Sequence, residues 1–318
     1  MDRPGAVTEL RAAVGAFAAA HDCARWCVGL SGGADSLALT AVAAALRPTV
    51  ALIVDHGLQA GSATVAQTAR QQALKLGCVD AQIITVDVGA AGGPEGAART
   101  ARYRALDHAR AGLPVLLAHT LDDQAETVLL GLGRGSGARS IAGMREFDAP
   151  WGRPLLTVRR AVTRAACAEL GLTPWEDPHN ADPRYTRVRL RTEVLPLLEE
   201  VLGGGVAGAL ARTAAALRED TEALDALAER TLPEVRRGEG LETAALAALP
   251  AAVRRRVIRV WLLEGGARDL TSLQIRRVDA LVTAWRGQGG VAVGSALRQA
   301  RLFAGRRDGV LTLHTETV

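Results

Sequence analysis

The sequence predicts an α/β fold in which a doubly wound, mostly parallel sheet is followed by a smaller helical domain with a short β element. Three observations predict it. Strand-like and helix-like segments alternate over the first half of the 318 residues, which is typical of a parallel sheet with helices on both faces. Helical periodicity replaces this alternation from residue 207 onward, and short strand-like segments come last. Gly203-Gly204-Gly205 marks the change, so we expect domains at residues 1–202 and 203–318.

The strand candidates of the first domain are short stretches rich in β-branched or aliphatic residues. They are residues 26–30, 50–55, 83–88, 115–118 and 155–158. Helix candidates lie between them, at residues 37–46, 64–76, 94–111 and 121–132. Gly77 and Gly112 follow two of these helices, as expected at helix C-termini. Ligands of such sheets bind beyond the carboxyl ends of the strands, so we expect the site in the loops that follow them.

The second domain is expected to be helical with a β tail. Apolar residues recur at helical spacing over residues 207–230, and again over 253–261 and 273–285. Short strand candidates follow at residues 290–293, 297–303 and 310–314. Asp308-Gly309 stands between the last two, and this dipeptide is a strong hairpin signal.

Composition limits the classes of protein to which the chain can belong. Its 48% hydrophobic and 23% charged residues are values of a globular protein, and 3% aromatic residues argue against reading bases mainly by ring stacking. The net charge of +4 is compatible with a polyanionic partner. The four cysteines form no C-x-x-C pair, which fits a reducing cytoplasm. We see neither a signal-peptide pattern nor an apolar run of about 20 residues, so we expect a cytoplasmic protein and no membrane partner.

The loop after the first predicted strand is the strongest functional signal. The order strand, glycine turn, helix places backbone N–H groups at a helix N-terminus, where they can hold an anion. Adjacent glycines let the backbone approach a phosphate, and two serine hydroxyls add donors. Neither the Walker pattern nor the dinucleotide fingerprint matches. We therefore interpret the loop as a phosphate cradle rather than an ordinary glycine-rich turn. It comprises Ser31, Gly32, Gly33, Ala34, Asp35 and Ser36.

Two further groups border this loop in the predicted sheet. Asp55 and His56 end the second strand, and His56 can donate to a phosphate or ribose oxygen. A histidine satisfied by the backbone of its turn is the alternative. Arg99, Arg102 and Tyr103 have spacings of three and four residues, so they share one helix face. Two guanidinium groups there can hold polyphosphate or neutralise a bound adenylate, and a merely solvated face is the alternative.

Acidic residues follow the fourth predicted strand. The segment opens with His119, and Asp123 and Glu126 lie three residues apart on one helix face. Magnesium is bound by one or two carboxylates together with substrate phosphates, and a carboxylate pair can also hold an ammonium group. Ordinary capping by acidic residues in the first helical turn is the alternative.

A run of alternate arginines comes near the end of the first domain. Arg187, Arg189 and Arg191 project to one side only if their segment is extended, because on a helix they would spread around it. The run is either a patch for nucleic-acid phosphates or a solvated surface.

Taken in order, these motifs resemble those of the tRNA(Ile)-lysidine synthetases, which belong to the ATP pyrophosphatase, or PP-loop, enzymes. The resemblance is specific over roughly residues 25–200 and is one of arrangement only beyond them. The matching positions are residues 31–36 and 55–58, Arg99, Arg102, Tyr103, residues 118–119, 122–124, 126–127, 134–135 and 153–156, Asp177 and Asn180.

The resemblance implies a Rossmann-like ATP pyrophosphatase domain, a helical tRNA-contacting domain and the activity of a ligase. ATP adenylates O2 of the wobble cytidine of a tRNA(Ile) with a CAU anticodon, and pyrophosphate leaves. The ε-amine of L-lysine then displaces AMP, which gives lysidine. The implied cofactors are ATP and Mg²⁺, and a homodimer stays open. The residues alone indicate a phosphate cradle, carboxylates and arginines; lysine and cytidine come from the resemblance only.

The resemblance also suggests roles for the site residues. The loop amides and serines hold the departing pyrophosphate, and Asp35 either caps the helix or reaches magnesium. Arg99 or Arg102 stabilises the charge that develops at the α-phosphate. Asp123 and Glu126 bind magnesium, the lysine ammonium group, or both.

Two other sets of residues complete this interpretation. The nucleotide site also includes Asp55, His56 and His119. Arginines of the second domain are expected to meet tRNA phosphates, and these are Arg254, Arg255, Arg256, Arg298 and Arg301.

Three other functions could share the loop. A sulfur-transferring tRNA enzyme would need a C-x-x-C pair or a poised cysteine, and no such pair occurs. An amide-forming synthetase that uses ammonia would usually carry a glutaminase domain or interface. A non-catalytic sensor of adenine nucleotides would leave the carboxylate pair and the second domain without a role.

Overall fold

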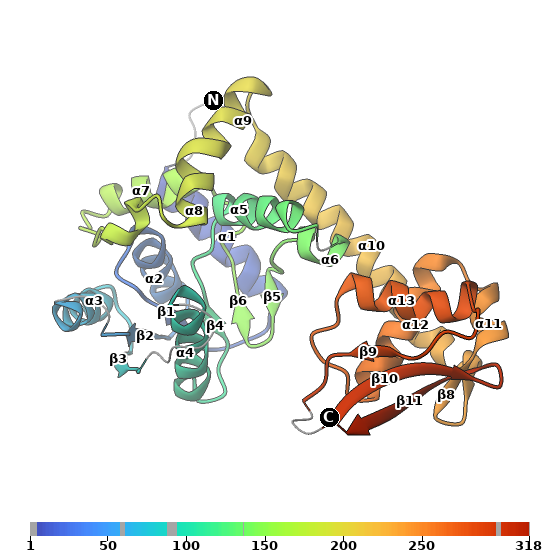
Figure 1. Cartoon of the computed structure of the whole chain (residues 1–318). Helices are drawn as coiled ribbons and strands as arrows, with labels where there is room; N and C mark the ends of the chain where they lie inside the picture. Colours follow the sequence, from blue (N-terminus) through green and yellow to red (C-terminus); the bar gives the residue numbers. More distant parts are fainter. Residues whose placement is uncertain (1–4, 58–60, 88–93, 136, 297–299, 318) are drawn as a thin grey trace. The chain divides into compact units, whose positions relative to one another are not determined.

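The computed structural model describes residues 5–57, 61–87, 94–135, 137–296 and 300–317. The chain forms two compact units, one of residues 1–129 with 143–212 and one of residues 130–142 with 213–318. Helix α10, Val206–Val235, begins in the first unit and ends in the second (Figure 1). The assignment of residues 1–202 to catalysis and of 203–318 to tRNA contact stays a prediction.

A six-stranded sheet with the order β3-β2-β1-β4-β6-β5 forms the centre of the first unit (Figure 1). Neighbouring strands are parallel except for β5, which pairs antiparallel with β6. The strands are β1 Trp26–Gly29, β2 Thr49–Asp55, β3 Asp80–Thr85, β4 Val115–Leu116, β5 Phe147–Asp148 and β6 Trp151–Gly152. The predicted mostly parallel α/β sheet is confirmed.

The strand predicted at residues 155–158 is wrong. This stretch forms turns, in which the amides of Leu156 and Val158 donate to the carbonyls of Arg153 and Leu155. Leu155 is fully buried, so the apolar pattern reported burial rather than strand geometry. The sheet takes its strand from Trp151–Gly152 instead. The predicted strand at 83–88 ends at Thr85, and residue 88 lies outside the described residues.

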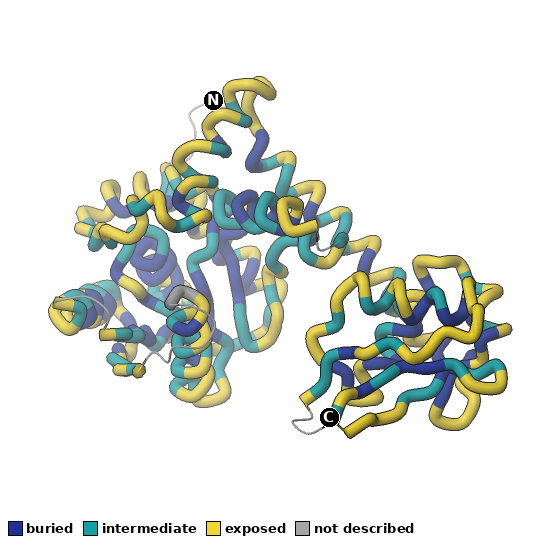
Figure 2. The backbone as a smooth tube through the Cα atoms, viewed as in Figure 1, coloured by how far each residue is buried: buried dark blue, intermediate teal, exposed yellow. Residues whose placement is uncertain are grey.

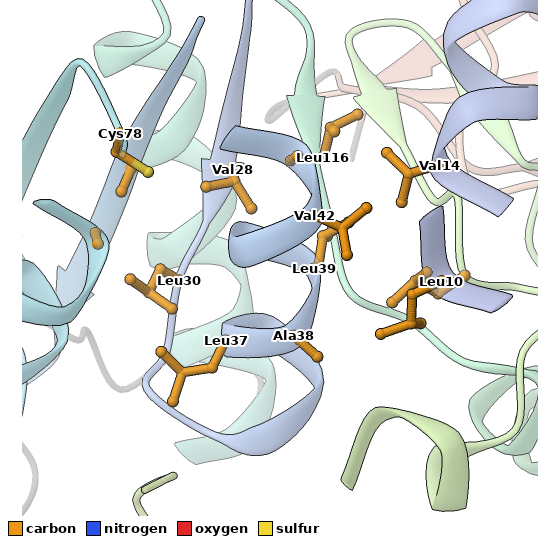
Figure 3. Close-up of a cluster of buried hydrophobic side chains, with 14 of the residues drawn as sticks. Leu10, Val14, Val28, Leu30, Leu37, Ala38, Leu39, Val42, Cys78 and Leu116 are labelled. Carbon is orange, nitrogen blue, oxygen red and sulfur yellow. The ribbon is translucent and has the colours of Figure 1, made fainter. Parts of the chain in front are cut away.

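Helices cover both faces of this sheet. Side chains of successive strand residues point to opposite faces. Trp26 and Val28 belong to the larger buried cluster, which includes residues of helices α1, α2, α3 and α7, whereas Cys27 belongs to a smaller cluster with Leu106 of α4. Figure 3 shows part of the larger cluster, including Leu39. Burying such a leucine completely stabilises the fold by about 1.5–3 kcal/mol.

The helices of the first unit agree with the predicted ones to within a few residues, and the structure adds several. They are α1 Ala6–Ala20, α2 Ala34–Leu46, α3 Ser62–Lys75, α4 Pro94–Ala109, α5 Leu121–Gly133, α7 Arg160–Glu169, a 3₁₀ turn η1 Pro178–Ala181, α8 Thr186–Arg189, a π-helical turn η2 Leu190–Val194 and α9 Leu195–Val201. Arg187, Arg189 and Arg191 thus lie on helical backbone and do not share one side.

The second unit is helical with a small antiparallel sheet. Its helices are α6 Ala138–Ile141, the end of α10, α11 Thr243–Ala248, α12 Ala251–Glu264 and α13 Ser272–Thr283. Its sheet has the order β7-β8-β11-β10-β9. The strands are β7 Arg236–Arg237, β8 Gly240–Glu242, β9 Val291–Val293, β10 Ala300–Arg307 and β11 Val310–Thr317.

The hairpin between β10 and β11 turns at the predicted dipeptide. Asp308 and Gly309 have φ of 49° and 77°, the left-handed backbone that a two-residue hairpin turn requires. The short strands β7 and β8 were not predicted, and residues 297–299 of the predicted strand 297–303 lie outside the described residues.

Each unit has its own buried core. In Figure 2 the central strands and α2 of the first unit are mostly dark blue, and a second group of buried residues lies among the elements of the second unit. Within the described part of the chain, no single helix has the length and apolar character needed to cross a membrane. One sharply bent pair, Thr186–Val201 with Val206–Val235, meets that test by length and composition alone.

Candidate active site

The loop between β1 and α2 is partly exposed, with Gly32 and Ser36 buried. Gly32 has φ of 85°, which favours glycine, and the N-cap of α2 is Gly33, which has no side chain that could accept from the amides of the first turn. Ser31 is exposed, and Gly33 and Ala34 are half-buried. The amides of the first turn of a helix have no partner within the helix. The loop therefore keeps backbone donors at an accessible helix N-terminus, as the phosphate-cradle interpretation requires.

Ser36 braces this loop from within. Its Oγ donates to the carbonyl of Gly33 at 3.0 Å, accepts from the amide of Ser31 at 3.2 Å and lies 3.1 Å from the Ser31 Oγ. The amide of Trp175 donates to the carbonyl of Gly32 at 2.9 Å. These bonds fix the curvature of the loop and direct its carbonyls inward. Ser36 is buried, so its main contribution in this structure is to the shape of the loop.

Three predicted carboxylates meet at one arginine that the sequence analysis missed. Arg160 is the first residue of α7, and its side chain is 16% exposed. Its Nε lies 3.2 Å from Oδ2 of Asp35, its second terminal nitrogen 2.5 Å from Oδ1 of Asp123, and its first terminal nitrogen 3.3 Å from Oε1 of Glu126. One guanidinium group thus joins the loop helix α2 to the helix α5.

A second missed arginine and a threonine complete this cluster. Arg191, in the π-helical turn, contacts Oε1 and Oε2 of Glu126 at 2.8 and 3.2 Å and Oδ1 of Asp123 at 3.9 Å. The hydroxyl of Thr163 donates to Oδ1 of Asp35. Three carboxylates therefore face two guanidinium groups. We call Asp35, Asp123, Glu126, Arg160 and Arg191 the acidic cluster.

Local chemistry shifts the pKa values of this cluster in different directions. Burial raises the pKa of Asp35, although the Thr163 hydrogen bond and Arg160 act against it. Burial would also raise the pKa of Asp123, but Arg160 and hydrogen bonds from the amide and hydroxyl of Thr120 outweigh it and lower the pKa. Burial opposes the charge on Arg160, yet its carboxylate partners raise its pKa.

Cationic and imidazole side chains with unsatisfied atoms form a second group. The atoms His56 Nδ1, Arg102 Nε, His119 Nδ1 and Arg153 Nε are buried and have no hydrogen-bond partner in the described part of the chain. Arg99 lies over the ring of Tyr103 at 4.9 Å, and Arg102 over the same ring at 5.7 Å. We call Arg99, Arg102, His56, His119 and Arg153 the cationic cluster.

The pKa values in the cationic cluster reflect burial. Burial lowers the pKa of His119 to about 3 against the pull of Asp123, so its imidazole is neutral at pH 7. Burial and, after it, Arg102 lower the pKa of His56. Burial lowers the pKa of Arg102 as well, with Tyr103 acting against it. Buried polar atoms normally find a partner, so the Nε–H groups of Arg102 and Arg153, which have none among the described residues, indicate a place for an anionic ligand.

Two further residues that the sequence singled out form hydrogen bonds within their own turns. Asp55 accepts from the amide of Gly57 at 3.0 Å and closes the turn that holds His56. Leu58 lies outside the described residues. Asp177 caps η1 by accepting from the amide of His179 at 2.9 Å.

The sequence contained a signal for one of the missed residues and not for the others. Arg191 belongs to the run of alternate arginines, but the pattern of that run does not indicate which residues Arg191 contacts. Arg160 follows the matched residues 153–156 closely, yet it lies 125 residues from Asp35. Thr163 lies 128 residues from Asp35 and belongs to no motif. Such pairings depend on tertiary structure.

The carboxylates do not form a free metal site as they stand. Oδ2 of Asp123 accepts from Thr120, and its Oδ1 faces Arg160. Both oxygens of Glu126 face arginine, and its side chain is fully buried. Across the described ranges, no group of three or more metal-ligating side chains occurs. Binding of Mg²⁺ by Asp123 and Glu126 would require the two arginines to move, so it stays a prediction.

Comparisons with known proteins agree with this geometry. The PP-loop domain model matches residues 7–198, and the TilS substrate binding domain model matches residues 241–306. The tRNA(Ile)-lysidine synthases of Mycobacterium tuberculosis and Mycolicibacterium paratuberculosis are 72% and 73% identical, each covering 100% of both chains. That of Rhodococcus erythropolis is 63% identical over 98% of this chain and 96% of its own.

A solved structure supports the fold alone. The U34-tRNA thiolase NcsA from Methanococcus maripaludis matches with a TM-score of 0.54 at 17% identity, covering 67% of this chain and 80% of its own. The matches do not favour the sulfur-transfer or sensor alternatives. The chain therefore belongs to the tRNA(Ile)-lysidine synthase family and carries its ATP-binding PP-loop domain in the residues that build this site.

Proposed function

We propose that this protein converts the wobble cytidine of a tRNA(Ile) with a CAU anticodon to lysidine. ATP adenylates O2 of the base with loss of pyrophosphate, and the ε-amine of L-lysine then displaces AMP. One observation carries the proposal: an accessible loop with free backbone donors lies at the carboxyl end of β1, next to carboxylates on α5 and a group of buried, unpartnered donors. The identity to lysidine synthases over the whole chain supports the choice of substrates.

Each cluster fits one charged partner of this reaction. The cationic cluster fits the phosphates of ATP, and the acidic cluster fits the ammonium group of lysine. The loop amides suit the pyrophosphate, and Arg99 and Arg102 suit the charge that develops at the α-phosphate. Three carboxylates against two guanidinium groups leave one net negative charge in the acidic cluster. That charge suits the ammonium group of lysine and would hold it near Asp123 and Glu126.

We include Mg²⁺ in the proposal as the ion that accompanies ATP. When bound, it would neutralise phosphate charge. No step is assigned to it, because arginines occupy the carboxylates predicted to hold it. Removal of Mg²⁺ with EDTA is expected to abolish pyrophosphate release, and added Mg²⁺ is expected to restore it. Full release in EDTA would contradict this part of the proposal.

The second unit is proposed to contact the tRNA backbone. Residues 130–142 and 213–318 contain 18 arginines and 13 acidic residues, a net charge of +5, whereas the other residues contain 20 basic and 21 acidic ones. Arg254 is buried and bonded to Asp279 at 2.6 Å, so we no longer include it in this surface. Arg301 is exposed on β10, and Arg298 lies outside the described residues.

Three arginines around one carboxylate form the best-defined basic surface of this unit. Arg139 of α6 and Arg256 of α12 both contact Oδ1 of Asp225, Arg256 at 3.1 Å. Burial, followed by repulsion from Arg139, lowers the pKa of Arg259 nearby. One carboxylate cannot neutralise three guanidinium groups, so the surface keeps a net positive charge and suits phosphate groups. We call Arg139, Arg256 and Arg259 the basic surface.

Location and assembly remain part of the proposal. The cysteines at 23, 27, 78 and 167 are all free, which supports a reducing cytoplasm. A homodimer is a prediction that light scattering of the purified protein tests.

The deciding experiment is mass spectrometry of tRNA(Ile) after incubation with the protein, ATP and L-lysine. We expect the mass of lysine less water to appear on the anticodon fragment, with AMP and pyrophosphate in equal amounts. Omitting lysine should abolish this mass gain and leave the base either unmodified or adenylated. ATP binding without any change of the tRNA would favour the sensor alternative, and a mass gain requiring a sulfur donor would favour the thiolase alternative.

A further inference from the structure

The carboxylates of the cluster lie on two helices that are connected at this point through one side chain of the described residues. Asp35 lies in the first turn of α2, whereas Asp123 and Glu126 lie on α5. Arg191 reaches only the α5 pair, and Thr163 reaches only Asp35. Among the described residues, Arg160 is the side chain that contacts all three.

The backbone of Arg160 is held as firmly as its side chain. Its amide donates to Oδ2 of Asp122 at 2.8 Å, so α7 begins directly against α5. The guanidinium group has five N–H donors in a rigid, planar fork, which lets one side chain serve several carboxylates in fixed directions. A lysine in its place would supply a point charge with three donors and no such fork.

Removal of this side chain would change the charge of the cluster sharply. Arg191 would then be the guanidinium group left for Asp123 and Glu126, Asp35 would keep the hydroxyl of Thr163, and two negative charges would be left uncompensated in a largely buried place. The two helices would lose their common contact, and the distance between the loop and α5 would no longer be fixed. A misplacement of about 1 Å at a reacting centre costs about 100-fold in rate.

We infer that Arg160 is a positioning residue that holds the loop carboxylate Asp35 and the α5 carboxylates Asp123 and Glu126 as one array, so that the nucleotide and the amine are placed relative to each other. The inference rests on the proposed function for the identity of the amine. Arg160 acts through the carboxylates and not on the reacting atoms.

The test compares Arg160→Met with a matched control, Arg159→Met. Arg159 is the neighbouring residue, is 46% exposed, and contacts Asp122 and Glu199 at 3.2 and 3.8 Å, outside the acidic cluster. Three quantities are measured: the Kd of a non-hydrolysable ATP analogue, the Kd of L-lysine, and kcat. The first two are binding measurements and need no turnover.

Arg160→Met makes the cluster more negative, but we expect the loss of the fixed array to outweigh this gain, to weaken both ligands by about tenfold and to lower kcat by about 100-fold. Arg159→Met should keep wild-type values of all three. Thr163→Val removes the bond of the hydroxyl to Asp35 and its bond within α7 to the carbonyl of Arg160, but no bond to Asp123 or Glu126, so it should weaken the ATP analogue and leave lysine binding unchanged. Arg160→Lys should lie between wild type and Arg160→Met, since it returns the charge without the fork.

Equal values for Arg160→Met and Arg159→Met would overturn the inference, and so would an effect confined to one ligand. If Arg160→Met does not fold, Arg160→Lys decides in its place: losses for both ligands support the inference, and wild-type binding of either overturns it. The wild-type protein alone decides the proposed function, by forming lysidine or not. The ratios of variant to wild type decide the role of Arg160, so the two failures are distinguishable.

Discussion

The acidic and cationic clusters of the site differ in how their charges are satisfied. In the acidic cluster each carboxylate contacts a guanidinium group, and Arg160 alone serves three of them. In the cationic cluster four buried nitrogen atoms have no partner among the described residues. The carboxylates of the first cluster are therefore held in place before a ligand binds and keep one net negative charge, whereas the second cluster needs an anion to complete it. The difference teaches that one side of the site is rigid without its ligand and that the other side depends on its ligand.

The largest expected effect is the loss of activity in Asp123→Asn. The substitution keeps the shape of the side chain and an oxygen for the Thr120 bonds, but it removes the charge that faces Arg160. We expect the formation of AMP and pyrophosphate to fall by about 100- to 1,000-fold, the size of effect seen when a charge-stabilising group is removed from an active site. The melting temperature is the control, and a shift of more than about 10 °C would mean that the fold was affected. Turnover close to wild type in a well-folded variant would remove Asp123 from the site.

The second effect contrasts the two clusters directly. Arg102→Met removes a buried cation whose Nε has no partner, so we expect the free energy of unfolding to stay level or rise. Arg160→Met breaks a satisfied cluster, so we expect a loss of about 3 kcal/mol. Activity should fall in both, by about 100-fold for Arg102→Met through lost stabilisation of phosphate charge. Denaturant titration measures the stabilities. Equal destabilisation by the two substitutions would show that the clusters do not differ in the way described.

Whether a site residue was predictable from the sequence depends on how far apart along the chain it and its partner lie. The loop, Asp123 and Glu126 were predicted because glycine turns and spacings of three residues act locally. Arg160 was not, since its bond to Asp35 spans 125 residues and no periodicity connects them. The apolar composition of residues 155–158 predicts a strand, but such composition reports burial, and a buried turn has the same composition. The sequence thus predicted the ligand-facing parts of the site better than the contacts that support them.

A smaller effect concerns pH. The pKa of His119 is lowered from an ordinary 6.5 to about 3, so as the pH falls below 6.5 the unfolded chain takes up a proton that the folded protein does not. Stability that is complete above pH 6.5 is lost progressively between pH 6.5 and 3. At pH 5 we expect a loss of about 1–2 kcal/mol relative to pH 7 from this group.

His119→Gln tests this assignment, because glutamine keeps polar atoms in place and does not titrate in this range. The melting temperature of the variant should fall less than that of wild type between pH 7 and pH 5. Parallel curves for the two proteins would contradict the assignment. The outcome also sharpens the contrast between the clusters, since an anion bound at the cationic cluster would favour protonation of His119 and reduce the loss.

The smallest effect lies in the second unit, where the same distinction between satisfied and unsatisfied charge appears again. Arg254 and Asp279 form a buried pair, whereas the basic surface has three arginines for Asp225. Arg256→Ala should weaken tRNA binding several-fold and reduce the slope of log K against log salt by about 0.7–0.9, the value of one phosphate contact. Asp225→Asn removes the neutralising charge, so it should tighten binding.

Tighter tRNA binding in Asp225→Asn together with weaker binding in Arg256→Ala distinguishes a phosphate-binding surface from a structural ion pair. If Asp225 served only to hold α6 and α12 together, its loss would weaken binding or leave it unchanged, as loss of Arg256 would. Arg276→Ala, at an exposed position of α13, is the matched control and should keep the wild-type salt slope. Filter binding of tRNA at several salt concentrations measures all three variants. Weaker binding in both Asp225→Asn and Arg256→Ala, at an unchanged salt slope, would assign the three arginines to the fold and move the tRNA contact elsewhere on the second unit.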